Sequence, residues 1–248
     1  PYVQEMEVQY LEVDLPEQFK KLQAGLSRVI KNKLSGVKAN GHIRDVDLNK
    51  TQLLMAQRDL QAEIRGGQPE PTVWRSISIL AEALKAQHAL ELVETQGISA
   101  LLSYLSSLER QAARGQSKAV KNLVSDPDFR HVLERAEDLS DKGRAHPKFI
   151  KLLSLVKLEL AKNPDAKIIV FNQYRDQASR IVQSLSDKAR LFVGQQKKGE
   201  TGLSQKEQKE MLAAFREGAF PVLVATSVGE EGLDIPAVDL VVFYEPVP

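Results

Sequence analysis

Cysteine is absent from all 248 residues, which excludes a disulfide scaffold, a zinc site built on cysteine and a cysteine nucleophile. Apolar runs are short: none approaches the ~18 residues of a membrane span, and no basic-then-apolar signal pattern opens the chain. The net charge is only +1, so bulk charge says nothing about partners. These absences fit a cytoplasmic protein, and no membrane partner is predicted.

Histidine is also scarce. The four histidines lack the spacing of metal ligands, so the sequence predicts no metal site: His42, His88, His131 and His146. His88 lies in an apolar helical stretch, where a place in the core or on a helix face is the simpler interpretation.

The chain begins without methionine and stops at residues 244–248 (YEPVP), directly after a strand-like run, so we expect a piece of a longer protein.

The sequence divides into three segments. Residues 1–16 alternate apolar and polar positions and end at a proline, which predicts an edge strand leading into a larger domain. Residues 17–145 have apolar positions at helical spacing and carry 20 Lys and Arg against 16 Asp and Glu, a net charge of +4. They predict an all-α domain whose first helix is broken at Ser35-Gly36. Trp74 and the Leu and Ile rows of residues 77–108 are expected in its core, not as a base-stacking platform.

The third segment, residues 146–248, alternates strand and helix patterns. Strands are predicted at residues 167–171, 189–193, 222–225 and 240–243, with helices at 177–185 and 204–216 between them. Their continuous β-branched and aromatic runs are typical of parallel strands buried on both faces. We therefore expect an α/β fold, a parallel sheet with right-handed crossovers and helices on both faces. Ligands of such sheets bind at the carboxyl ends of the strands.

The densest candidate cluster is residues 226–236 (TSVGEEGLDIP), directly after a buried strand. Hydroxyls and free backbone N–H groups at a strand-to-helix turn suit a phosphate oxygen. The carboxylate of Asp234 only accepts hydrogen bonds, which suits a ribose hydroxyl. A turn of small residues with a capping carboxylate explains the spacing equally well, so both interpretations stay open.

This string resembles motif V of superfamily-2 helicases. Residues 168–174 (IIVFNQY) resemble motif IV, and residues 202–208 (GLSQKEQ) with 215–218 (FREG) resemble the motif IVa region. The amino-acid sequence of motif V, together with residues 242–246 (VFYEP), resembles the archaeal Hef helicase/nuclease family. The eukaryotic counterpart of that family is the Fanconi-anaemia M translocase.

The helical segment, with residues 94–97 (ETQG), is similar to the thumb-like insert that those proteins place between two motor lobes. The resemblance covers essentially the whole chain. It implies a RecA-like second helicase lobe, truncated before motif VI, in residues 146–248, and an all-α thumb-like insert in residues 17–145. Residues 1–16 would be an edge strand and the entry to the second motor lobe.

The resemblance also assigns roles to individual residues. Four would hold the sugar–phosphate backbone of one strand: Gln173, Gly194, Lys206 and Thr226. Gly232 and Asp234 would face ATP from the second lobe. From the residues alone, Gln173 could instead cap a helix, Gly194 form a turn, and Lys206 point into solvent.

The intact protein would use ATP and Mg²⁺ between this lobe and a first helicase lobe of the same chain. The sequence has no Gly-x-x-x-x-Gly-Lys-Ser/Thr loop, no Asp-Glu box and no arginine-rich motif VI. Phosphoryl transfer depends on these parts. We therefore assign no catalytic residue and expect these residues alone to hold no nucleotide and hydrolyse no ATP. The resemblance further implies forked or branched DNA, a C-terminal nuclease domain and a sliding clamp as partners, and a nucleoid-associated location.

A second candidate surface is a basic stripe with only one nearby acid: Arg110, Arg114, Lys118 and Lys121. Such a stripe can track phosphates, and a solvated helix face is the alternative. Two other functions stay open. One is a double-stranded-RNA-binding ATPase module of the RIG-I type, whose members carry a related insert. The other is a plain protein-interaction module.

Overall fold

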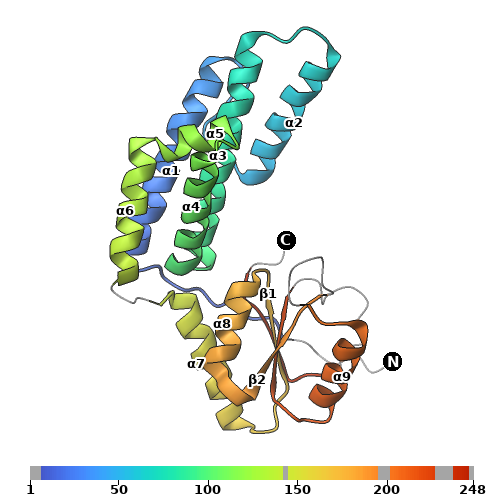
Figure 1. Cartoon of the computed structure of the whole chain (residues 1–248). Helices are drawn as coiled ribbons and strands as arrows, with labels where there is room; N and C mark the ends of the chain where they lie inside the picture. The colour runs from blue at the N-terminus through green and yellow to red at the C-terminus, as the bar shows by residue number, and fades with distance from the viewer. Residues whose placement is uncertain (1–6, 142–144, 195–201, 227–236, 246–248) are drawn as a thin grey trace.

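The computed structural model describes residues 7–141, 145–194, 202–226 and 237–245. Figure 1 shows two bodies, a helical bundle that rises from an α/β lobe, as the sequence predicts. The bundle contains α1 (Glu17–Ala39), α2 (Lys50–Gly66), α3 (Pro71–Thr95), α4 (Ile98–Ala113), α5 (Lys118–Val124) and α6 (Pro127–Asp141).

Helix α3 is the axis of this insert, because α1, α2, α4 and α5 all pack against it. One buried apolar cluster runs through the bundle and includes Leu22, Leu80 and Leu105. Local signals fix several helix starts. Asn49 and Gln52 form a reciprocal capping box at α2, and Pro71 occupies the first turn of α3, where no N–H is needed.

Two expectations for the first 40 residues are wrong. Residues 7–16 lie outside helix and strand, so the described part of the predicted edge strand is not a strand. Their side chains are largely exposed, and alternation forms a strand only where a neighbouring strand offers hydrogen bonds. Helix α1 also continues through Gly36, where the missing side chain lets Ile79 of α3 approach closely. Packing between helices outweighs the weak helix propensity of glycine there.

The lobe contains β1 (Ile168–Asn172), β2 (Ala189–Phe192), β3 (Val222–Thr226) and β4 (Leu240–Phe243) in the order β2-β3-β1-β4. All pairs are parallel. Its helices are α7 (Pro147–Lys162), α8 (Arg175–Leu185), the 3-10 turn η1 (Ser186–Lys188) and α9 (Gln205–Arg216).

Both faces of the sheet are covered, as expected for an α/β lobe. In β1, Ile168 and Val170 face the cluster formed with α7 and α8, whereas Ile169 and Phe171 face the cluster formed with α9. Figure 1 shows α7 and α8 on one side of the sheet and α9 on the other. The parallel strands bring their carboxyl ends to one edge, which positions the candidate site. No described helix is long and apolar enough to cross a membrane.

Candidate nucleic-acid interface

The strand register brings Gln173 and Thr226 to the same edge of the sheet. Asn172, the last residue of β1, is paired with Thr226, the last residue of β3. Neighbouring strands lie about 4.8 Å apart, so Gln173 follows β1 within a few ångströms of Thr226. Thr226 is buried, at 8% exposure, whereas Gln173 is exposed.

Gly194 and Lys206 belong to the same edge through β2. Phe192 of β2 is paired with Ala225, and Gly194 follows two residues later. The Leu203 N–H donates to the Gly194 carbonyl (3.4 Å), and the Gln208 amide donates to the Val193 carbonyl (3.0 Å). These bonds hold the start of α9, with Lys206 in its first turn, beside the end of β2.

The start of α9 is well defined. Ser204 Oγ accepts from the Glu207 N–H, and the Glu207 carboxylate accepts from the Ser204 N–H (2.7 Å). Hydrogen bonds from the Ser204 side chain and backbone to the carboxylate lower the pKa of Glu207. Lys206 extends into solvent, 3.7 Å from Glu210, an exposed pair that contributes well under 1 kcal/mol and leaves the ammonium group accessible.

Gln173 does not cap α8. The N-cap of that helix is Tyr174, and Asn172 Oδ1 accepts from the Tyr174 N–H (2.8 Å). Within the described residues, the Gln173 side chain makes no hydrogen bond, so its amide is available to a ligand. Beside it, the buried Asn172 Nδ2 finds no acceptor in the described part of the chain. Sequence reasoning missed Asn172, whose unpartnered amide only coordinates could reveal.

The remaining edge residues lie outside the described part. Gly232 and Asp234, expected to face ATP, fall in residues 227–236, so the structure says nothing about them. Among the residues that are described, no group of three or more His, Asp or Glu could hold a metal ion.

The basic stripe spans the end of α4 and α5. Arg110 lies in the last turn of α4, Arg114 at its C-cap, and Lys118 and Lys121 on α5. All four are exposed and form no ion pair with a described residue. Four unpaired cations on consecutive turns suit a polyanion. Phosphate binding by this stripe remains a prediction.

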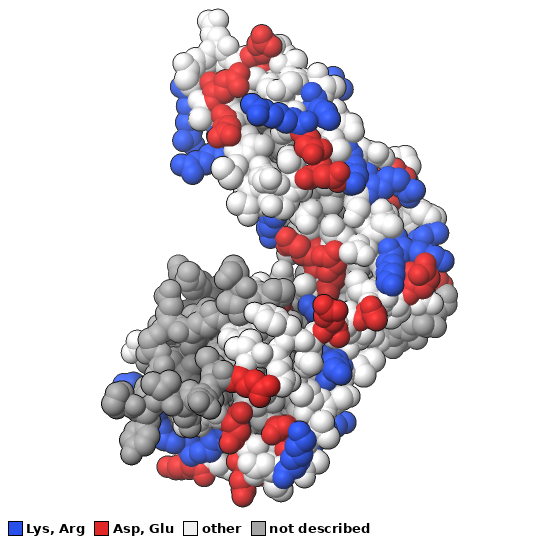
Figure 2. Space-filling model, turned by 180° about the vertical axis from the view of Figure 1, so that it is seen from behind, with Lys and Arg blue, Asp and Glu red and all other residues white. Residues whose placement is uncertain are grey.

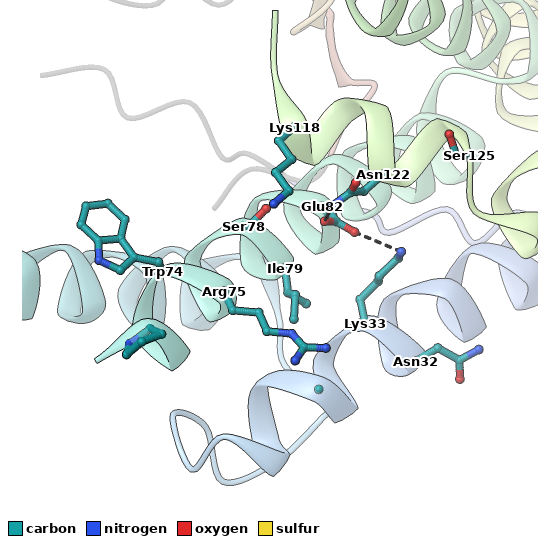
Figure 3. Close-up of a pocket in the computed structure, with 12 residues that line it drawn as sticks. Asn32, Lys33, Trp74, Arg75, Ser78, Ile79, Glu82, Lys118, Asn122 and Ser125 are labelled. Atoms are coloured by element: carbon teal, nitrogen blue, oxygen red, sulfur yellow. Dashed lines mark hydrogen bonds and ion pairs between the residues drawn. The ribbon is translucent and has the colours of Figure 1, made fainter. Parts of the chain in front are cut away.

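Lys118 also lines a groove of about 920 Å³ between α1, α3 and α5 (Figure 3). The groove contains a buried ionic network: Lys33 Nζ lies 3.0 Å from Glu82 and 2.7 Å from Asp126, and Asn122 donates to Glu82 (3.0 Å). Hydrogen bonds to the two carboxylates outweigh burial and raise the pKa of Lys33. Lys33 therefore stays charged, and Glu82 and Asp126 share its one positive charge.

A buried glutamate ties the insert to this edge of the lobe. Glu245, two residues beyond β4, accepts from Gln96 Nε2 at the end of α3 (2.5 Å) and from the Gln173 N–H (3.0 Å). Burial raises the pKa of Glu245. The contact joins positions 149 residues apart, which no local pattern in the sequence reveals.

His146 forms the second part of this junction. Its Nε2–H donates to the Val93 carbonyl of α3 (3.2 Å), and its Nδ1 accepts from the Lys148 N–H at the start of α7 (3.2 Å). Gly97, at φ +93°, lies so close that an added Cβ would be 3.0 Å from His146 Cβ. Burial lowers the pKa of His146 to about 4.

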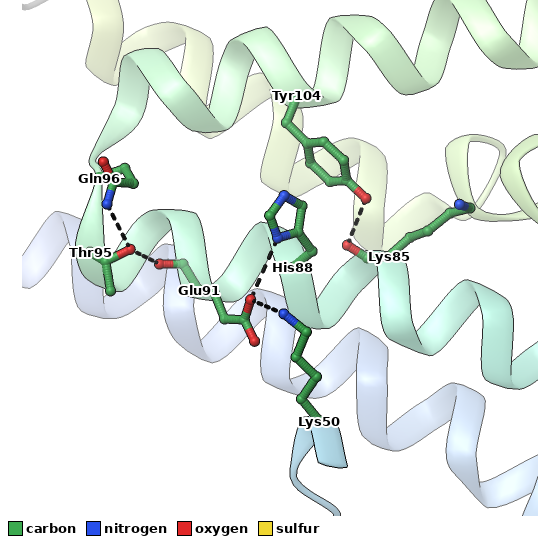
Figure 4. Close-up of polar contacts among 7 residues, drawn as sticks. All are labelled: Lys50, Lys85, His88, Glu91, Thr95, Gln96 and Tyr104. Atoms are coloured by element: carbon green, nitrogen blue, oxygen red, sulfur yellow. Dashed lines mark hydrogen bonds and ion pairs between the residues drawn. The ribbon is translucent and has the colours of Figure 1, made fainter. Parts of the chain in front are cut away.

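Along α3, polar contacts lead from the insert to the junction (Figure 4). Glu91 binds Lys50 (2.8 Å) and His88 (3.5 Å), and the Thr95 hydroxyl donates to the Glu91 carbonyl. His88 stands edge-on to Tyr104 at 4.6 Å, which confirms a helix-face role.

On the face in Figure 2, basic and acidic residues alternate over the insert, and the outline is hollowed between insert and lobe.

Comparison with known proteins places this architecture in a family. Residues 18–142 match the family described as "Putative ATP-dependent RNA helicase, helical bundle", and residues 148–248 match the helicase conserved C-terminal domain. The chain therefore belongs to this family of helicases, and the lobe is a RecA-like second helicase lobe.

Within that class, the chain is of the Hef type. The crystal structure of the Pyrococcus furiosus Hef helicase domain matches with a TM-score of 0.83 and 39% identity, covering 100% of this chain and 51% of that one. The "Putative ATP-dependent RNA helicase MJ1505" of Methanocaldococcus jannaschii is 38% identical over 253 residues, 100% of this chain and 31% of the relative. The ATP-dependent DNA helicase fml1 of Schizosaccharomyces pombe is 26% identical, covering 98% and 31%. The chain thus spans about a third of the length of these two relatives.

Proposed function

We propose that this chain provides the strand-gripping lobe and a DNA-holding insert of an ATP-dependent superfamily-2 DNA helicase or translocase that acts on forked or branched DNA. The observation that carries the proposal is the shared carboxyl edge, where Gln173, Thr226 and the start of α9 meet. An exposed amide, a lysine and a helix N-terminus are donors that suit phosphate oxygens.

The junction supports a joint action of the two bodies. Because Glu245 binds both Gln96 of the insert and the Gln173 backbone, a movement of the insert is transmitted to the strand-gripping edge. DNA held by the insert and a strand held by the lobe would therefore be positioned together.

In the whole protein, ATP and Mg²⁺ would bind between this lobe and a first lobe, and ATP hydrolysis would drive the motor. Gly232 and Asp234 would face the nucleotide from this lobe. We derive no hydrolysis step from the described residues. These 248 residues alone are expected to hydrolyse no ATP because they contain no phosphate-binding loop. A C-terminal nuclease domain, a sliding clamp and a nucleoid-associated location belong to the same proposal, since they follow from the Hef type alone.

Fluorescence anisotropy with a labelled DNA fork tests the proposal. Lys206→Ala should weaken binding and lower the slope of log affinity against log salt by about 0.9, one phosphate contact. Gln173→Ala should weaken binding at every salt concentration. Lys188→Ala, in the turn before β2 at the opposite edge of the sheet, is the matched control and should change nothing. Unchanged affinity in both edge variants would contradict the proposed grip.

Double-stranded RNA is the alternative ligand, because the M. jannaschii relative is named an RNA helicase. Competition between a DNA fork and an RNA duplex of equal length distinguishes the two. Preferential displacement by the RNA would favour the RIG-I-type function. A plain protein-interaction module predicts no binding of either nucleic acid at ~50 mM salt, where nonspecific phosphate contacts are detectable.

A further inference from the structure

Trp74 is exposed, contrary to the sequence-based expectation that it packs in the core. It lies in the first turn of α3, and 56% of its surface is accessible, whereas its neighbours Val73 and Ser76 are buried. A tryptophan side chain presents roughly 200 Å², so on the order of 100 Å² of mostly apolar surface faces solvent. A single exposed apolar residue needs no explanation, so its surroundings decide whether it has a role.

Trp74 lines the groove between α1, α3 and α5, together with two cationic side chains. Figure 3 shows Trp74 at one end of the groove, Arg75 extending from the next position of α3 and Lys118 reaching in from α5. At about 920 Å³, the groove lies within the size range of pockets that hold small ligands.

The charges in this groove leave a net attraction for anions. Arg75 and Lys118 form no ion pair or hydrogen bond with any described side chain. The one carboxylate that lines the groove, Glu82, is only 3% exposed. It shares Lys33 with Asp126, so this network carries one net negative charge against the two positive charges of Arg75 and Lys118. An aromatic face beside two free cations is the combination that proteins use for single-stranded nucleic acid, where bases stack and phosphates pair with basic groups.

We propose that this groove binds an unpaired nucleotide of single-stranded DNA, with Trp74 stacked on the base and Arg75 and Lys118 on the adjacent phosphates. The proposal rests on the proposed function and adds a ligand position to it. A duplex would not suffice, because its bases are stacked on one another and offer no free face. A fork supplies an unpaired strand for this groove next to its duplex.

The position of the groove sets its distance from the lobe. Trp74 precedes Thr95, the lobe end of α3, by 21 residues. At ~1.5 Å per residue the separation along the helix is about 30 Å. The groove would therefore hold the strand well away from the residues that grip it at the lobe edge.

Intrinsic fluorescence tests the proposal directly, because Trp74 is the only tryptophan in the chain. A short oligo(dT) strand should quench its emission, with the same salt-dependent affinity that anisotropy of a labelled strand reports. A blunt duplex should bind with little change in emission. Equal quenching by strand and duplex would overturn the claim that an unpaired base is recognised. Binding of the strand by anisotropy without any change in Trp74 emission would overturn the stacking claim.

Substitutions give an independent readout. Trp74→Ala should weaken strand binding about 5- to 150-fold, which corresponds to the ~1–3 kcal/mol of one base–aromatic stack. Trp74→Phe should keep most of the affinity. Ile150→Ala removes a similarly exposed apolar side chain on α7 and should have no effect. Arg75→Ala should lower the salt slope for the single strand by about 0.7, one phosphate contact. Circular dichroism verifies that each variant remains folded.

The outcomes separate this inference from the proposed function. Fork binding that depends on Lys206 but is unchanged by Trp74→Ala would reject the groove alone. Absence of binding to any DNA would reject both.

Discussion

Acid should weaken the junction between insert and lobe through His146. The imidazole is buried, and its neutral form uses both ring nitrogens, one toward the Val93 carbonyl and one toward the Lys148 N–H. Protonation would place a charge in a buried position and a second N–H against the Lys148 N–H. Burial accordingly lowers the pKa of His146 from 6.5 to about 4.

The size and sign of the effect follow from that shift. Because the folded pKa lies below the unfolded value, the unfolded chain takes up the proton first, and stability is lost as pH falls from 6.5 toward 4. Between pH 6.5 and 5, at ~1.4 kcal/mol per unit, the loss is about 2 kcal/mol. Glu245 acts in the opposite sense, because burial raises its pKa and the folded state favours its protonated form.

A matched variant isolates the histidine. In His146→Asn the amide oxygen can still accept from the Lys148 N–H, since asparagine is a strong N-cap residue, but it does not titrate. Urea unfolding followed by circular dichroism at pH 8, 7, 6 and 5 compares the two chains. The difference in unfolding free energy should move by about 2 kcal/mol in favour of the variant between pH 7 and 5. A difference that stays constant with pH would refute the buried, neutral imidazole.

Three further predictions, one with a control substitution, test the packing around the site. Glu245→Gln should lower the unfolding free energy by about 2 kcal/mol, since its NH₂ would face a buried donor, and a melting temperature equal to wild type would contradict this. Gly97→Ala should cost about 2 kcal/mol through its positive φ and its contact with His146. Gly115→Ala, at φ +67° with open space around it, should cost less, so equal losses would show that the contact is unimportant. Lys33→Met should cost about 3 kcal/mol by leaving Glu82 uncompensated, and a urea midpoint unchanged from wild type would argue against that network.

The elements of the fold were largely predictable because their signals are local. Helical spacing predicted α8 and α9 to within two residues, and β-branched runs predicted β1 to β4. The errors have physical causes. Gly36 stays helical because α3 packs against it, and the described part of residues 1–16 finds no strand partner. Trp74 was misplaced because it lies one position from Val73, and the buried face of α3 includes Val73 but not Trp74.

The site was predictable only in part. Gln173, Gly194 and Thr226 end or closely follow strands, so parallel pairing places them at one edge. Lys206 was selected by the family resemblance, and hydrogen bonds from Leu203 and Gln208 hold the start of its helix at that edge. The buried carboxylate of Glu245 depends on long-range contacts with the end of α3, and no spacing rule connects such distant positions.

The central claim is that the carboxyl edge of the sheet grips the nucleic acid, and crosslinking from a single position tests it most directly. Since the chain has no cysteine, Gln173→Cys and Lys188→Cys can each carry one photoreactive group, at opposite edges of the sheet. With a DNA fork, position 173 should crosslink to the strand and position 188 should not. Crosslinks from position 188 with none from position 173 would contradict the account.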